Sequence, residues 1–123
     1  MAGDEVAVGR VHTTAMEIEP RLRGILQELR ARLERLYGDQ LVGLLLYGSQ
    51  ARGDAEEESD VDVLVVLRKP IDAIAEIGRT GPEVAGLSLA HDVVISCVFK
   101  SQEQFETEHS PLMLNARAEG VAV

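Results

Sequence analysis

Hydrophobic residues recur with helical spacing in the first third of the chain. Between positions 20 and 38, apolar side chains lie three or four residues apart: Leu22, Ile25, Leu26, Leu29, Leu33 and Leu36. This is the period of an amphipathic helix. Pro20 suits a first helical turn, and Gly38 stands where helices commonly end. The pattern predicts one helix over this stretch.

Three continuous apolar runs follow: LVGLLLY at 41–47, VDVLVVL at 61–67 and DVVISCVF at 92–99. Runs of this length are typical of strands that are buried on both faces of a sheet. Residues 71–91, between the second and third runs, contain Gly81-Pro82. Because proline breaks or kinks a helix, this segment predicts two short helices or one broken helix.

The C-terminal segment carries two helix-start signals. Ser101 and Gln104, in SQEQ, have the spacing of a capping box. Ser110 precedes Pro111 as a helix-capping residue precedes a first-turn proline, and Gly120 stands where that helix would end. The final VAV can add a short strand.

The order of these elements predicts an α/β fold, a single domain whose mixed sheet is flanked by helices. The length of 123 residues fits one domain with one hydrophobic core. Residues 1–15 have mixed composition and no periodicity, so we assign them to a flexible N-terminal arm. Residues 16–123 form the predicted domain.

Composition narrows the functional classes. A formal net charge of -9 speaks against a general nucleic-acid binder and favours basic partners. No apolar run approaches the roughly 18 residues of a membrane span, and the N-terminus lacks a signal-peptide pattern. Cys97, as the single cysteine, excludes an internal disulfide framework. It fits a reducing, cytoplasmic setting.

Acidic residues gather in the stretch YGSQARGDAEEESDVD, residues 47–62, where the second apolar run begins. Asp60 and Asp62 are two residues apart, so on a strand they would point to the same face and repel each other. Mg²⁺ removes that repulsion, because it binds one or two carboxylates and completes its shell with water and substrate phosphates. The pair therefore predicts a metal site that also holds a phosphate.

Gly48 and Ser49 supply the phosphate side of this prediction. Glycine allows a sharp turn and a close approach by a ligand. If residues 49–53 form a helical turn, its free N–H groups and the Ser49 hydroxyl can bind an anion. If runs 41–47 and 61–67 pair, the end of the first lies beside the start of the second.

Simpler interpretations exist for each part of the stretch. Gly-Ser alone is usually a turn, Asp-Val-Asp is usually a solvated strand end, and Ser59-Asp60 can be a local cap. Their combination, between two buried strands, favours a functional site.

The stretch GSQARGDAEEESDVDVLVV resembles the signature of the polymerase-β-type nucleotidyltransferases. It is especially similar to the minimal nucleotidyltransferases of bacteria and archaea, whose pattern is Gly-Ser, ten residues, then Asp-x-Asp. Ser49 and Asp60 have that spacing. The segments LVGLLLYG and NARAEGVAV, and ARG after Gly-Ser, are also similar, so the resemblance covers residues 19–123. It implies the nucleotidyltransferase fold.

The resemblance also implies roles for the site residues. Asp60 and Asp62 would bind one or two Mg²⁺ ions that hold the triphosphate of ATP. Gly48 and Ser49 would contact its phosphates.

The resemblance also implies roles for Asp92 and Arg52, and each of these residues has an alternative role. The family uses a third carboxylate from a later strand to activate the attacking hydroxyl, and Asp92 is the acidic residue best placed for this. It would accept the proton or bind the metal near the nucleophile. A turn aspartate next to His91 is the alternative for Asp92. Arg52 would contact a phosphate or pair with the acidic loop 54–58.

Minimal relatives often pair with a small helical HEPN protein, and the nucleotidyltransferase acts as antitoxin by adenylylating a tyrosine of the HEPN toxin. Only about 20 residues follow Ser101, which we expect to be too few for a substrate domain. The resemblance therefore implies transfer of AMP from ATP to a partner protein. Alternatives are a non-catalytic nucleotide-binding antitoxin and transfer to a small molecule or an RNA end. The oligomeric state stays open, a homo-oligomer included.

Overall fold

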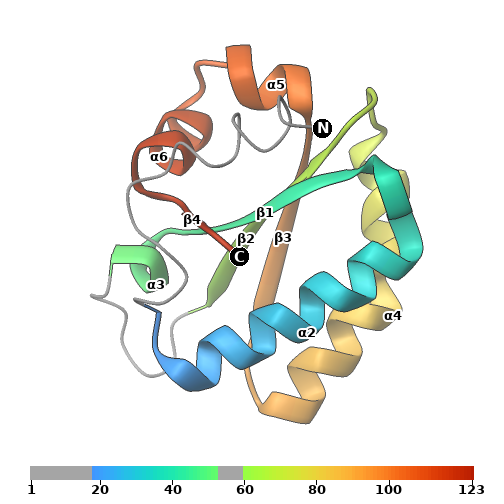
Figure 1. Ribbon diagram of the computed structural model, residues 1–123, viewed down its shortest axis with the longest axis vertical. Coiled ribbons are helices and arrows are strands. Elements are labelled where there is room, and N and C mark those ends of the chain that lie inside the picture. Colours follow the sequence, from blue (N-terminus) through green and yellow to red (C-terminus); the bar gives the residue numbers. More distant parts are fainter. Residues whose placement is uncertain (1–17, 53–59) are drawn as a thin grey trace.

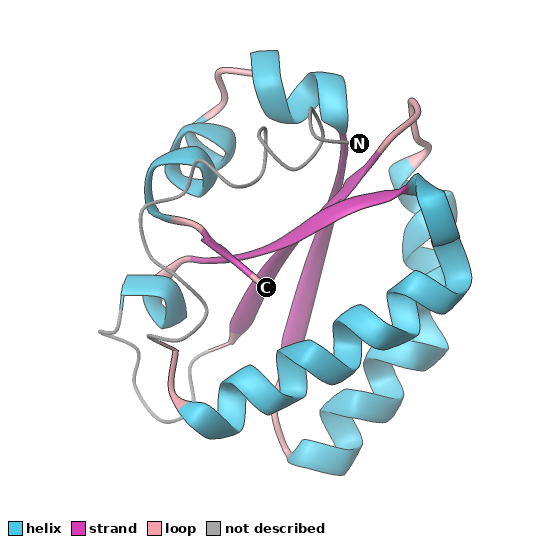
Figure 2. Cartoon of the chain, in the orientation of Figure 1, coloured by secondary structure: helices cyan, strands magenta, loops and turns pink. Residues whose placement is uncertain are grey.

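The computed structural model describes residues 18–52 and 60–123. These residues form one mixed sheet with helices on both faces, as Figures 1 and 2 show, so the predicted α/β fold is confirmed. The predicted N-terminal arm, residues 1–15, and the acidic loop 54–58 lie outside the described residues.

The sheet has four strands in the order β3-β2-β1-β4. β1 (Leu41–Tyr47) pairs antiparallel with β2 (Val61–Leu67) and with the short β4 (Val121–Ala122). β2 pairs parallel with β3 (Ile95–Ser101), which leaves β3 at one edge. β1 and β2 were predicted with these bounds from their continuous apolar runs, and both are buried along most of their length.

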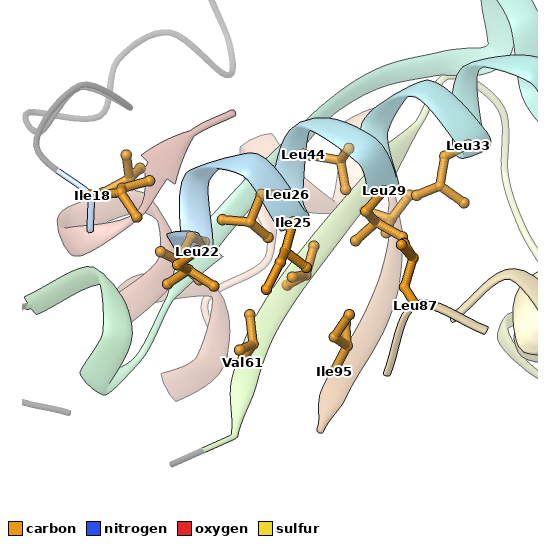
Figure 3. Close-up of a cluster of buried hydrophobic side chains, with 14 of the residues drawn as sticks. Ile18, Leu22, Ile25, Leu26, Leu29, Leu33, Leu44, Val61, Leu87 and Ile95 are labelled. Atoms are coloured by element: carbon orange, nitrogen blue, oxygen red, sulfur yellow. The ribbon is translucent and has the colours of Figure 1, made fainter. Parts of the chain in front are cut away.

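Two long helices cover one face of the sheet. α2 (Pro20–Tyr37) is followed by the 3-10 turn η2 (Gly38–Gln40), and α4 (Ala73–His91) lies beside α2 (Figure 1). Figure 3 shows the apolar stripe of α2 packed on the sheet residues of this face. The stripe consists of Leu22, Ile25, Leu26, Leu29 and Leu33. Burial of such a side chain stabilises the fold by about 1.5–3 kcal/mol.

The ends of α2 follow from its sequence. Glu19 caps the first turn, because its carboxylate accepts hydrogen bonds from the N–H groups of Arg21 and Leu22. Gly38 ends the helix with a φ of 55°, a conformation that glycine adopts without steric cost. The predicted helix over 20–38 is therefore confirmed.

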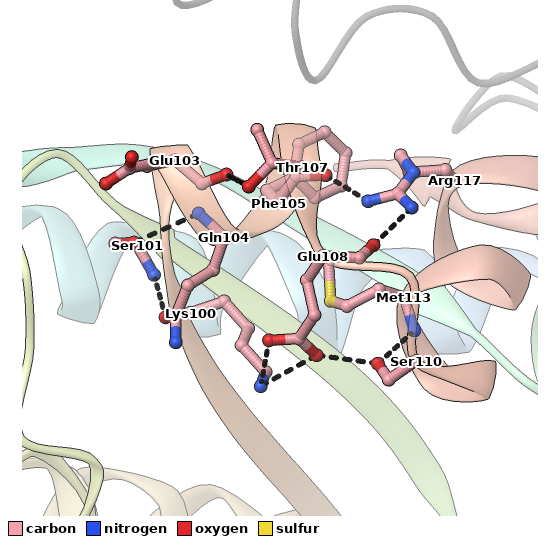
Figure 4. Close-up of polar contacts among 10 residues, drawn as sticks. All are labelled: Lys100, Ser101, Glu103, Gln104, Phe105, Thr107, Glu108, Ser110, Met113 and Arg117. Carbon is pink, nitrogen blue, oxygen red and sulfur yellow. Dashed lines mark hydrogen bonds and ion pairs between the residues drawn. The ribbon is translucent and has the colours of Figure 1, made fainter.

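Two short helices, α5 (Gln102–Thr107) and α6 (Pro111–Glu119), cover part of the other face. The predicted capping box is present, and its two hydrogen bonds between Ser101 and Gln104 appear in Figure 4. Ser110 caps α6 by accepting from the N–H of Met113. α3 (Ser49–Arg52) is a single turn between β1 and the segment that leads to β2.

Two predicted elements differ in the structure. α4 is one continuous helix across Gly81 and Pro82, neither two helices nor a broken one, because it packs against α2 and β3 and keeps Pro82 on its exposed side. The strand predicted at 92–99 begins only at Ile95. Asp92 instead caps α4 in the left-handed conformation, with φ 54° and ψ 51°.

Replacing Leu29 with alanine tests the core between α2 and the sheet. Leu29 is fully buried, so we expect Leu29→Ala to lower the free energy of unfolding by about 2–5 kcal/mol, measured by urea denaturation. Leu36→Ala is the matched control on the same helix, because Leu36 is 37% exposed. Equal losses for the two variants would contradict this assignment of the core.

Candidate active site

The antiparallel pairing of β1 and β2 brings the predicted site residues to one place. Tyr47, the last residue of β1, is the register partner of Asp62. Leu64, two residues after Asp62, packs in the α5–α6 layer, so Asp62 points to that same face. Asp60 lies just before β2 and is exposed. The expectation that the end of 41–47 lies beside the start of 61–67 is confirmed.

Gly48 lies directly against the carboxylate of Asp62. Its φ is 77°, in the left-handed region, and a Cβ placed on it would be 2.8 Å from Oδ2 of Asp62. Any larger residue would therefore both strain the backbone and displace the carboxylate. Glycine at this position lets the turn after β1 close over the acidic side chain.

The Asp62 carboxylate is held where its negative charge is disfavoured. Burial is the main cause that raises the pKa of Asp62 above its ordinary value, and the nearby negative charge of Asp60 raises it further. The pKa of Tyr47 is also raised, mainly by burial and then by the charge of Asp62. A cation bound between the two aspartates would relieve this repulsion.

The turn predicted at 49–53 is present as α3, which spans Ser49–Arg52 and begins immediately after Gly48. The N–H of Ala51 donates to the carbonyl of Gly48 at 3.1 Å, which closes the turn. Ser49 and Arg52 are the first and last residues of α3. Their contacts with phosphates stay predictions, since only their backbone is described.

The third predicted acid lies on neither β2 nor β3. Asp92 ends α4, and α4 covers the face of the sheet opposite to the one that Asp62 faces. In the parallel ladder the partner of Asp62 is Ser96, which is partly buried. Sequence reasoning did not assign Ser96, because its place beside Asp62 follows only from the register of two distant segments.

The described acids fit a Mg²⁺ site with two protein carboxylates. Across 18–52 and 60–123, no three His, Cys, Asp or Glu side chains gather into a metal-binding group. Two carboxylates are enough for Mg²⁺, which takes its remaining ligands from water and substrate phosphates. Among the same described residues, no helix is long and apolar enough to cross a membrane.

Sequence comparison finds relatives in Methanocaldococcus jannaschii. "Putative protein adenylyltransferase MJ0141" is 36% identical over 72 residues, which are 58% of this chain and 72% of the relative. "Putative protein adenylyltransferase MJ1305" is 44% identical over 50 residues, or 41% of this chain. That match spans only 34% of the length of MJ1305.

Solved structures share the fold. A chain of "the toxin-antitoxin with AMP-PNP" superposes with a TM-score of 0.54 at 21% identity, over 76% of this chain and 68% of that one. A chain of "the toxin-antitoxin MntA-HpeT mutant-D39ED41E" gives a TM-score of 0.52 at 19% identity, with the same two coverages. At these identities the similarity shows the fold alone.

The profile of one protein family matches most of the chain. The family is described as "Nucleotidyltransferase domain", and the match covers residues 26–110. These residues include Gly48, Asp60 and Asp62, the three that the structure brings together. The chain therefore belongs to the nucleotidyltransferase domain family.

Proposed function

We propose that the chain is a Mg²⁺-dependent nucleotidyltransferase that transfers AMP from ATP to a hydroxyl group of a partner protein. The observation that carries the proposal is the close approach of Gly48 to Asp62, which joins the glycine turn and the acidic pair in one site. Relatives named as protein adenylyltransferases support a protein acceptor. A structural neighbour bound to AMP-PNP supports an adenine nucleotide as donor.

In this proposal the acceptor is a helical HEPN toxin, modified on a tyrosine, and the chain acts as its antitoxin. Structural neighbours from toxin–antitoxin complexes support such a partner. The overall charge of -9 suits a partner that presents basic residues to it.

We assign the residue roles from the family resemblance and, for Gly48, Asp60 and Asp62, from their adjacency. Asp60 and Asp62 would hold one or two Mg²⁺ ions, which neutralise charge on the attacking and leaving oxygens of the reaction. Gly48, Ser49 and Arg52 would contact the triphosphate. The acceptor hydroxyl attacks the α-phosphorus, the bond from that phosphorus to the bridging oxygen breaks, and pyrophosphate leaves. In the proposal, Asp92 receives the proton of the hydroxyl or binds the metal near it, which requires Asp92 to reach the site from the end of α4.

A non-catalytic nucleotide-binding antitoxin is the second candidate. The observation that favours it is the position of Asp92 at the end of α4, with the neutral Ser96 beside Asp62 on β3. Such a module would bind the nucleotide and neutralise its partner by occlusion.

Mass spectrometry separates the two candidates. When the chain is co-expressed with the protein encoded by its neighbouring gene, we expect that protein to gain the mass of AMP. Asp62→Asn should reduce this addition by at least ~10–100-fold. Replacing a residue that only hydrogen-bonds to a metal ligand already causes a loss of that size. Asp39→Asn is the matched control, because Asp39 is exposed in η2. An unmodified neighbour that still binds tightly would favour occlusion.

Gly48→Ala tests the contact between the turn and the carboxylate. We expect the affinity for Mg-ATP, measured by calorimetry, to fall at least ~10-fold, because the new Cβ displaces Asp62. Gly38→Ala is the control: Gly38 also has positive φ, but nothing lies within 4 Å of its Cβ position. Both variants lose stability, because alanine is strained at the positive φ of each position. Equal nucleotide affinities in the two variants would refute the role of Gly48.

Asp92→Asn tests the assignment of the third acid. Asparagine tolerates the left-handed conformation, so α4 keeps its end. We expect AMP transfer to be lost while Mg-ATP still binds. Ser96→Ala, compared in the same assay, measures what the residue beside Asp62 contributes. Normal transfer by Asp92→Asn would remove Asp92 from the mechanism.

A further inference from the structure

All ionisable side chains of α4 lie on one side of the helix. Each of them contacts α2 or a neighbour that does, and none turns to the opposite side of the helix. They are Glu76 and Arg79 at Tyr37, Glu83 at Arg32, and His91 at Glu28. The remaining half of the helix circumference carries no charge.

That uncharged side exposes large apolar side chains. Ile74 is 82% exposed, Ile77 is 55% exposed and Leu89 is 85% exposed. A hollow of ≈ 310 Å³ opens beside them, between α4 and the edge strand β3, with Cys97 and Phe99 in its wall. Three large apolar side chains exposed on one uncharged helix side, beside a hollow, indicate a surface that binds another protein.

Gly78, in the same face, has no neighbour in the chain that requires a glycine, whereas Gly81 precedes Pro82, whose ring crowds the Cβ of the residue before it. A Cβ added to Gly78 or Gly81 would meet nothing within 4 Å, yet glycine inside a helix costs about 1 kcal/mol relative to alanine. Missing side chains let a second helix come closer, because the distance between packed helices depends on the residues at the contact.

We propose that this face of α4 pairs with the same face of a second copy of the chain. When α4 pairs with an antiparallel copy of itself, the sizes of the residues that face each other match. In an antiparallel pair whose two-fold axis passes between Gly81 and Pro82, Ile74 of one copy lies opposite Leu89 of the other. Gly78 then lies opposite Ala85. The large residues Ile74 and Leu89 meet at the two ends, and Gly81 and Pro82 lie at the axis itself.

Charge agrees with a second copy as the occupant, and the small contact area limits how tightly it binds. A basic partner would find no acidic group on this face to pair with, whereas an identical face brings no charge to be buried. α4 has 19 residues and is therefore about 28 Å long. A contact face about 10 Å wide gives roughly 300 Å² per copy, below the ~800 Å² of stable interfaces, so the dimer is weak.

The paired face is separate from the nucleotide site. α4 covers the face of the sheet opposite to Asp62, so a second copy on α4 leaves Gly48 and the two aspartates open. The pairing leaves these three residues accessible, whereas Asp92, three residues after Leu89, lies next to the paired face.

Sedimentation equilibrium over a micromolar to millimolar concentration series tests the pairing. We expect the average mass to rise from one chain toward two. Raising the salt concentration should strengthen association, because salt screens the repulsion between two chains of charge -9. A monomer at every concentration would overturn the proposal. So would association that weakens with salt, which is the behaviour of oppositely charged surfaces.

Charge substitutions test the antiparallel register. Leu89→Lys alone and Ile74→Glu alone should each raise the dimer dissociation constant at least ~10-fold, because each buries an unpaired charge. The double variant should recover most of the affinity, since opposite charges at positions 74 and 89 then face each other across the axis. Leu114→Lys is the control: Leu114 is 50% exposed on α6, away from α4.

All these positions are exposed, so circular dichroism should show native helix content in every variant. Dimers that tolerate both single changes, or a double variant no better than the singles, would overturn the pairing.

Discussion

The register between β1 and β2 is the constraint on which the site depends. Odd-numbered residues of β2 pack under α2 and α4, and even-numbered ones pack under α5 and α6. A shift of one residue would send valines to the wrong layer and turn Asp62 into the α2–α4 core. Burial on both faces therefore fixes the register. The register in turn sets Tyr47 opposite Asp62 and lays the Gly48 turn on its carboxylate.

The site is locally destabilising, and burial in the core offsets that cost. A partly buried carboxylate next to a second one is unfavourable, and so is a turn that only glycine can make. The layers of leucine and valine on either side of β2 offset these costs and hold the end of β1 in place. Such local violations of the rules that stabilise the rest of a chain are characteristic of functional sites.

Local signals predicted most of the fold, and non-local pairing decided the rest. The spacing of leucines in α2, the caps at Ser101 and Ser110, and the apolar runs of β1 and β2 were sufficient to predict those elements. The start of β3 was predicted wrongly, because packing of α4 against its neighbours carries the helix through Pro82 to His91. The strand can begin only where the chain pairs with β2. Ser96 was not assigned from the sequence, because its place beside Asp62 depends on the pairing of two distant segments.

Under the proposed function, the chain's charge makes metal and nucleotide depend on each other. ATP carries several negative charges toward a protein of net charge -9 and toward two aspartates at one strand end. Without a cation, both the long-range field and the local repulsion oppose the nucleotide. Mg²⁺ alone gains only two carboxylates from the described residues, too few to replace most of its water. Tight binding therefore requires both together.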